Sequence, residues 1–346
     1  PRVWRRWVKR RDLMRRLPEP GYSSWRSDLE AAAARIHAAT PVDLTVATAN
    51  PATAWMAAWH LHRTHGVPYV LDQRDGWSLD VFSGNRVHAR GSKIGRWETR
   101  LFAEAREVWF VNEPIRNWYA AEYPDAAARM HVVMNGWDPD LAPATDAFAP
   151  AQAPLVYGYL GTISRKVPLA EFIDGWRRAR ADDDLVAEAS CSLRGYLGFY
   201  KTPDAANQDL VHQAEAVGIT FGGAAAKTEV ASVYAGFDVL LLILGSCRFV
   251  TSGKVFEYLA TGLPIVSVHD PTNAASDVLR GYPLWFPAAS LTPADVAAAL
   301  SAAGHAALTA DEVSRAEARR HAARYSRRNQ LNPRIMALTS PPGTVA

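Results

Sequence analysis

The chain has 346 residues, of which 49% are hydrophobic and 21% charged, and its net charge at pH 7 is +3. This composition excludes a disordered chain, the length is sufficient for two ordinary domains, and no apolar run approaches the roughly 20 residues of a membrane-spanning helix. Cys191 and Cys247 provide neither a disulfide framework nor a metal-ligand pattern, so we expect a reducing compartment, namely the cytoplasm.

The first residues combine cations with large apolar side chains. Trp4, Trp7, Leu13 and Met14 are interleaved with Arg2, Arg5, Arg6, Lys9, Arg10, Arg11, Arg15 and Arg16. This pattern predicts a basic amphipathic helix, which either gives peripheral contact with an anionic membrane or packs its Trp side chains on its own domain. The segment lacks the apolar core and cleavage site of a signal peptide. Because no nucleic-acid-binding module accompanies the cations, we expect no nucleic acid partner.

Strands and helices alternate along the first part of the chain. The expected strands cover residues 42–47, 69–71 and 107–111, and the expected helices cover residues 52–65, 93–105 and 112–122. Asp72, Arg74, Asp75 and Trp77 follow the strand 69–71, at the end where open α/β sheets bind their ligands. Two carboxylates around an arginine can hold hydroxyl groups of a substrate. The alternative is a salt-bridged loop with a structural role.

A change of composition separates the two halves. Residues 138–154 are rich in Pro, Ala, Thr and Asp and predict a linker. Beyond it, strands are expected at residues 155–160, 189–193, 219–221, 239–244 and 264–268, with helices between them, and two helices are expected after Pro293. This alternation predicts an α/β fold with doubly wound parallel sheets. We assign residues 1–137 to the first domain, 155–310 to the second and 311–346 to a C-terminal helical segment.

The stretch 251–268 carries the most specific pattern. It follows an unbroken apolar run, and Ser252 is placed to cap a short helix that Gly262 and Pro264 end. A helix N-terminus with Ser252, Gly253 and Lys254 attracts anions, because its N–H groups and its dipole face the ligand. Glu257 lies almost one turn deeper, within reach of a neutral polyol part of the same ligand. A phosphate site beside a hydroxyl-binding carboxylate indicates a nucleotide sugar.

This stretch resembles a known family. The pattern Lys254-x-x-Glu257-Tyr-Leu-Ala-x-Gly262-x-Pro264 is similar to the donor-site signature of family 4 glycosyltransferases. The resemblance implies the GT-B fold, with two Rossmann-like domains facing a cleft and a C-terminal helix that crosses back to the first domain. Because such proteins normally begin with a strand and a glycine-rich turn, we expect the first strand of the N-terminal domain to be missing from this chain.

The resemblance also implies an activity, the retaining transfer of a sugar from a nucleotide-diphosphate sugar without a metal or other cofactor. The expected acceptor is a cell-envelope glycan or a lipid-linked precursor. Arg165, Lys166 and Asp75 are the expected catalytic residues. The expected substrate-binding residues are Gly161, Thr162, Ser252, Gly253, Lys254, Val255, Glu257, Asp72 and Arg74. The family usually has an acidic residue eight positions before the glutamate, where this chain has Phe249, so the sugar-side contact is not specified.

Two other classes stay open. A sugar-nucleotide epimerase shares the GT-B architecture but requires an acid/base pair, and a non-catalytic nucleotide-binding subunit would fit Phe249 and the missing strand. His60, His62 and His65 are expected at the surface rather than on a metal, because His60 and His62 point to different sides of their helix. Asn135-Gly136 predicts a turn with positive φ before the linker.

Overall fold

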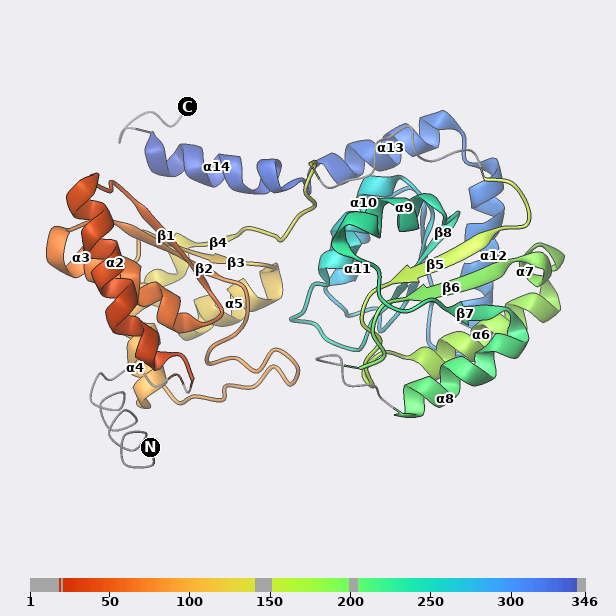
Figure 1. The fold of residues 1–346 in the computed structure, drawn as a ribbon, viewed down its shortest axis with the longest axis horizontal. Helices are drawn as coiled ribbons and strands as arrows, with labels where there is room; N and C mark the ends of the chain where they lie inside the picture. The colour runs from red at the N-terminus through yellow and green to blue at the C-terminus, as the bar shows by residue number, and fades with distance from the viewer. Residues whose placement is uncertain (1–18, 20, 141–150, 199–204, 341–346) are drawn as a thin grey trace. The chain divides into compact units, whose positions relative to one another are not determined.

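The computed structural model describes residues 19, 21–140, 151–198 and 205–340 (Figure 1). The basic segment at residues 1–16 and most of the predicted linker therefore lie outside the described residues. The chain divides into two compact units, Pro1–Met134 and Asn135–Ala346, and each unit is described by itself.

The first unit is built on a sheet of parallel strands. The strand order is β1-β2-β3-β4, with β1 (Thr45–Ala49), β2 (Tyr69–Gln73), β3 (Glu107–Phe110) and β4 (Met130–Val132). The helices are α2 (Arg26–Ala39), α3 (Trp55–His65), α4 (Lys93–Glu104) and α5 (Glu113–Glu122). β2 and β3 are buried along their whole length, as expected for central strands of a covered parallel sheet.

The second unit has a six-stranded parallel sheet in the order β10-β9-β8-β5-β6-β7. Its strands are β5 (Val156–Leu160), β6 (Ser190–Arg194), β7 (Ile219–Phe221), β8 (Val239–Ile243), β9 (Ile265–Val268) and β10 (Trp285–Pro287). From β5 the chain builds outward to β7, then returns to the other side of β5 and builds outward to β10. The order therefore reverses between β5 and β8, and this reversal is the point where open α/β sheets bind ligands.

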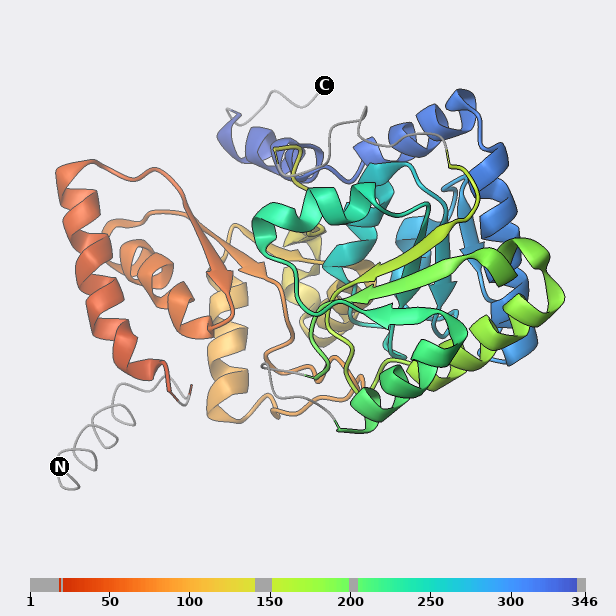
Figure 2. The same ribbon diagram turned by 45° about the vertical axis from the view of Figure 1, so that its right-hand side comes forward.

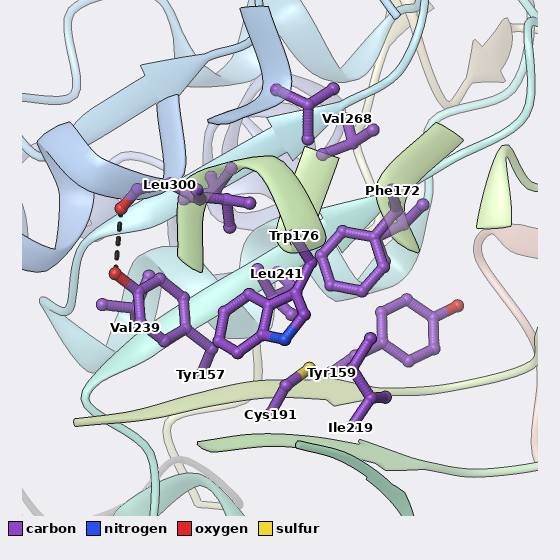
Figure 3. Close-up of a cluster of buried hydrophobic side chains, with 14 of the residues drawn as sticks. Tyr157, Tyr159, Phe172, Trp176, Cys191, Ile219, Val239, Leu241, Val268 and Leu300 are labelled. Atoms are coloured by element: carbon purple, nitrogen blue, oxygen red, sulfur yellow. Dashed lines mark hydrogen bonds between the residues drawn. The ribbon is translucent and has the colours of Figure 1, made fainter. Parts of the chain in front are cut away.

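Helices cover both sides of the second sheet (Figures 1 and 2). The helices on this sheet are α6 (Leu169–Asp182), α7 (Asp184–Glu188), α8 (Ala205–Ala214), α9 (Val230–Ala235), α10 (Gly253–Thr261), α11 (Ala275–Leu279), α12 (Pro293–Thr309) and α13 (Glu312–Ala323), and the last helix, α14 (Arg327–Thr339), follows α13 without covering the sheet. α6 packs against α12, and α10 packs against α11 and α13. The core between the sheet and α6 is aromatic: Trp176 contacts Tyr157, whose hydroxyl donates to the carbonyl oxygen of Leu300 at 2.9 Å (Figure 3).

The predicted α/β class with parallel sheets is confirmed, and most expected elements agree with the structure within a few residues. Two differences concern the ends of elements. β2 extends to Gln73, so Asp72 belongs to the strand rather than to the loop after it. The single last helix expected from residue 311 to about 328 was wrong: α13 ends at Ala323 and α14 begins at Arg327. The helix breaks there because the backbone groups of Tyr325 and Arg327 are hydrogen-bonded to Trp137 instead.

Candidate functional site

The predicted anion site is the N-terminus of α10, directly after β8. Ser252 occupies the N-cap position as expected, but its side chain makes no capping hydrogen bond. The helix ends at Gly262, which has a φ of +73°. Val255 faces the core and is fully buried, so only its backbone lies at the helix start. The first turn therefore presents backbone N–H groups without a side-chain cap, at the strand end next to the reversal of the sheet.

Lys254 connects α10 to the neighbouring strand β5. Its Nζ donates a hydrogen bond to the Tyr159 hydroxyl at 2.6 Å and lies 4.2 Å from the centroid of the same ring. The Tyr159 hydroxyl in turn donates to the carbonyl oxygen of Thr162 at 2.9 Å. Gly161 passes directly beneath the lysine side chain, and a Cβ atom at this position would overlap Lys254 Cε and Nζ. Lys254 from one predicted motif is thus in contact with Gly161 from the other.

Burial lowers the pKa of Lys254 to about 8, and the nearby Glu257 carboxylate opposes this shift. The cause is desolvation, which disfavours the charged ammonium when it leaves water. An anion placed beside this ammonium would compensate for the lost hydration. The site therefore contains a desolvated cation whose protonated form a bound anion would stabilise further.

Glu257 is exposed, and a tyrosine from another helix orients it. The Tyr234 hydroxyl, at the end of α9, donates to Glu257 Oε2 at 2.7 Å. Within the described part of the chain, no other hydrogen bond reaches this carboxylate. The adjacent Tyr258 hydroxyl is buried and accepts from the Leu160 backbone N–H at 3.1 Å, which holds α10 against the end of β5. Glu257 is thus held in place with acceptor capacity left for ligand hydroxyl groups.

The loop after β5 carries the other predicted cations. Arg165 and Lys166 are exposed and line a cavity of about 610 Å³ together with the first turn of α6, Asn207 and Ser246. The loops after β5 and β8 are in contact, because the space for a Cβ atom on Gly245 is filled by the backbone of Lys166. Arg165 and Lys166 therefore lie at the same end of the sheet as the N-terminus of α10. Thr162, another predicted substrate-binding residue, belongs to the same loop after β5.

In the first unit, Asp72 and Arg74 form a salt bridge. Arg74 Nε lies 2.8 Å from Asp72 Oδ2, which also accepts from the Thr48 hydroxyl at 3.1 Å. Arg74 Nη1 donates to the carbonyl oxygen of Val133 at 3.2 Å. Asp72 is 5% exposed, whereas Asp75 is exposed. Asp72 and Arg74 are thus paired with one another, their binding of substrate stays a prediction, and Asp75 is the carboxylate of this cluster that faces solvent.

A buried carboxyl group that holds the same loop was not predicted from the sequence. Glu98 on α4 is fully buried and accepts hydrogen bonds from Ser78 N–H and from the hydroxyls of Tyr119 and Tyr123. The Tyr119 hydroxyl also accepts from the N–H of Trp77 at 2.9 Å. Burial raises the pKa of Glu98 above its usual range. The sequence feature that could have indicated this buried carboxyl group is the position of Glu98 on the apolar side of α4, three residues before Leu101.

The predicted surface histidines have no metal-like arrangement. His62 Nδ1 lies 3.1 Å from the carbonyl oxygen of Val67, and the His65 ring contacts the ring of His37. Among the described residues, no group of three His, Cys, Asp or Glu side chains could hold a metal ion. None of the helices in the described part of the chain is long and apolar enough to cross a membrane.

Comparisons with known proteins relate the chain to solved structures of very different sequence. No protein-family model and no curated protein matches it. The Anabaena protein Alr3699 (HepE), in complex with UDP and glucose, is 14% identical over 93% of this chain and 84% of that chain, with a TM-score of 0.58. Sucrose-phosphate synthase from Thermosynechococcus elongatus is 16% identical over 93% and 81%, with a TM-score of 0.62.

A third similar structure is a UDP-forming trehalose-phosphate synthase from Burkholderia xenovorans. It is 12% identical over 92% of this chain and 78% of that chain, with a TM-score of 0.63. At these identities the likeness shows the fold. The GT-B fold expected from the sequence, with two Rossmann-like domains, is confirmed.

Proposed function

We propose that this protein is a glycosyltransferase that moves a sugar from a nucleotide-diphosphate sugar to a glycan or lipid-linked acceptor. The observation that carries the proposal is the assembly of Lys254, Gly161 and the uncapped N-terminus of α10 at the reversal of the second sheet. These groups are suited to a diphosphate, and the nearby Glu257 is suited to ribose hydroxyl groups. Because the similar Anabaena structures contain UDP and UDP-glucose, a UDP-sugar is the first donor to test.

The proposed chemistry follows from where negative charge develops. As the bond between the sugar and the diphosphate breaks, charge grows on the leaving phosphate. Arg165, Lys166, Lys254 and the N–H groups at Ser252 and Gly253 would stabilise this charge. An acceptor hydroxyl attacks the same face of the sugar that the phosphate leaves, so the anomeric configuration is retained, as in family 4 enzymes. The acceptor's proton passes to a phosphate oxygen of the leaving group, and the mechanism needs neither a protein base nor a metal.

The acceptor side is assigned to the first unit. Asp75 is proposed to contact the acceptor or the transferred sugar, because it is exposed beyond the strand end that the buried Asp72–Arg74 pair stabilises. The basic segment at residues 1–16 is proposed to bring the enzyme to the inner face of the membrane. Both assignments agree with a lipid-linked precursor of a cell-envelope glycan as the acceptor.

The proposal is tested first by nucleotide binding. Thermal stability is measured with UDP, GDP, ADP and TDP, with and without magnesium, for the wild type, Glu257→Ala and a control, Glu317→Ala. Glu317 is an exposed glutamate on α13 whose carboxylate is paired with Arg320. One diphosphate should stabilise the wild type and the control without magnesium, and Glu257→Ala should weaken its binding roughly tenfold or more, the effect of losing charged hydrogen bonds.

Transfer is then measured with sugars of the nucleotide that binds. Glu257→Ala should raise the donor KM by a similar factor, and near-normal donor kinetics in this variant would remove the proposed nucleotide site. Release of free nucleotide without any acceptor would instead indicate an epimerase. Tight binding without turnover on any acceptor would indicate a non-catalytic subunit.

A further inference from the structure

The exposed side of α4 is mostly basic, and its last residue, Glu104, is partly exposed and acidic. Between residues 81 and 103, the exposed charged side chains are all cations, namely Arg90, Lys93, Arg96 and Arg100. The one acidic residue in this range, Glu98, is fully buried. Lys93, Arg96 and Arg100 follow one another at spacings of three and four residues and therefore share one side of the helix. The opposite side packs Trp97, Leu101 and Phe102 into the first unit.

An exposed aromatic pair lies beside this cationic side. Tyr22 and Trp25 are 43% and 50% exposed, and their rings meet edge to face with centroids 5.1 Å apart. Arg26, the next residue, stacks on the ring of Trp97 at 5.3 Å, and Arg100 stacks on the same ring at 5.3 Å. The start of α2 and the side of α4 are thus joined through Trp97, at the lower left of Figure 1. We call Tyr22, Trp25, Lys93, Arg96 and Arg100 the basic aromatic face.

We infer that the basic aromatic face binds an anionic lipid bilayer. Trp and Tyr rings are amphipathic and are stabilised at the level of lipid headgroups, where neighbouring Lys and Arg side chains attract anionic lipids. Exposed cations alone would fit nucleic acid or an acidic protein equally well. The exposed aromatic pair at their edge favours a bilayer, because the headgroup region solvates the polar ring edge while the apolar part leaves water.

The acids near this face are either paired with other cations or fewer than the cations. Glu104, one turn after Arg100 on α4, lies 3.5 Å from His62 and 3.7 Å from Arg63. Glu30 is paired with Arg26 at 2.6 Å, and this arginine is not one of the exposed cations. Asp28 is exposed on α2 and opposes the three cations with a single charge. The face adds a second contact, within the described residues, to the membrane contact proposed for residues 1–16. Because binding to a bilayer requires no sugar transfer, the inference stands or falls independently of the proposed enzyme activity.

The test is binding of the full chain to vesicles of phosphatidylcholine, with and without phosphatidylglycerol, in the absence of donor and acceptor. The variant Lys93→Glu/Arg96→Glu/Arg100→Glu reverses the charge of the three cations of the basic aromatic face and leaves residues 1–16 unchanged. A control of equal net charge, Arg106→Glu/Lys227→Glu/Arg320→Glu, reverses exposed cations elsewhere. The first variant should bind anionic vesicles at least about tenfold more weakly than the wild type, since each cation near the surface contributes severalfold. The control should bind like the wild type at low salt.

A second variant separates the aromatic contribution from charge. Tyr22→Ala/Trp25→Ala leaves every cation in place and should also weaken binding several-fold, and hydrogen exchange of residues 22–26 and 93–100 should slow on anionic vesicles. Thermal unfolding confirms that each variant is folded. The inference would be overturned if the charge-reversal variant bound anionic vesicles as tightly as the wild type. It would also be overturned if the control lost as much vesicle binding as that variant, or if the wild type did not bind. Binding to RNA or heparin that persists when vesicle binding is absent would overturn it as well.

Discussion

The Lys254 ammonium donates a 2.6 Å hydrogen bond to the Tyr159 hydroxyl, and this contact joins α10 to β5 across the reversal of the second sheet. A lysine from the first turn of α10 thereby lies over the glycine that follows β5. The Lys254 ammonium, on the helix that follows β8, therefore contacts residues in and directly after β5, and it is between these two strands that the sheet order reverses and a ligand would bind. The protonation of Lys254 is therefore expected to affect both ligand binding and the stability of the second unit.

Ligand binding should depend on the protonation of Lys254. Its pKa is lowered to about 8, so the ammonium loses its proton as the pH rises above this value. A bound diphosphate favours the protonated form, and its affinity should therefore fall through this range, by roughly tenfold for the loss of one charged hydrogen bond. Calorimetric titration with the preferred diphosphate at about pH 7 and about pH 9.5 measures the effect. In Lys254→Met the dependence should disappear; an unchanged slope in that variant would assign the titration to another group.

The same pKa shift predicts a pH-dependent stability difference. Between about pH 8 and the ordinary value of 10.5, the unfolded chain holds a proton on Lys254 that the folded chain has lost. The free energy of unfolding therefore rises with pH in this window, by up to about 3 kcal/mol from this residue. Relative to Lys254→Met, the wild type should gain stability as the pH rises through the window, and urea denaturation at several pH values measures the difference. A constant difference between the two proteins would contradict the shift.

Gly161 and Gly253 form a matched pair for testing the packing of the site. Gly161→Ala should displace the Lys254 side chain, because the new Cβ overlaps Cε and Nζ and the φ of +151° is strained for alanine. We expect a loss of one to a few kcal/mol of stability, roughly as for overpacking, together with weaker diphosphate binding. Gly253→Ala adds a Cβ with no protein atom within 4 Å and should leave the melting temperature nearly unchanged. Equal melting temperatures for both variants would show that Lys254 does not occupy this position.

How much of this could be predicted from the sequence depends on distance along the chain. The spacing of Lys254, Glu257 and Gly262 within one short helix predicted their arrangement, because local periodicity determines which residues share a helix side. Their partners Tyr159 and Tyr234 lie 95 and 23 residues away, so only the folded sheet brings them together. The break between α13 and α14 was missed for the same reason, since the residues that cause it lie beside Trp137. Glu98 was missed because its three hydrogen-bond donors come from the β2 loop and α5 region.

Tyr119 and Tyr123 test how the loop after β2 is held. Both hydroxyls donate to Glu98, but only Tyr119 also accepts from the backbone N–H groups of Trp77 and Ser78, at 2.9 and 3.2 Å. Tyr119→Phe removes the acceptor of the Trp77 N–H, whereas the Ser78 N–H keeps Glu98, and the variant should cost about 1–3 kcal/mol, the penalty of one unsatisfied buried group. It should also speed hydrogen exchange at residues 77 and 78. Tyr123→Phe removes one bond to the same carboxyl group and should leave exchange in the loop unchanged. Faster loop exchange in both variants would mean that Glu98, rather than Tyr119, restrains the loop.

Residues 135–138 are hydrogen-bonded to the segment between α13 and α14, and this contact predicts the effect of adding a methyl group at Gly136. The Trp137 N–H donates to the carbonyl oxygen of Tyr325 at 2.9 Å, its indole Nε1 donates to Ala322 at 2.8 Å, and Asp138 pairs with Arg327 at 2.7 Å. As predicted from Asn135-Gly136, Gly136 has a positive φ of +62°, and its backbone approaches Tyr325 so closely that a Cβ would lie 2.6 Å from the carbonyl oxygen.

Gly136→Ala should therefore destabilise the second unit through two causes, the backbone strain and the clash with Tyr325. Gly223→Ala is the matched control, because Gly223 has a φ of +68° and no atom within 4 Å of the position that a Cβ would occupy. Each variant should lose about 1–2 kcal/mol from the left-handed backbone, and Gly136→Ala should lose about 1–3 kcal/mol more from the clash. Calorimetry of the two variants measures the difference in melting temperature. If Gly223→Ala is as destabilised as Gly136→Ala, the close approach of Tyr325 to Gly136 is wrong, and with it the reason given for the break between α13 and α14.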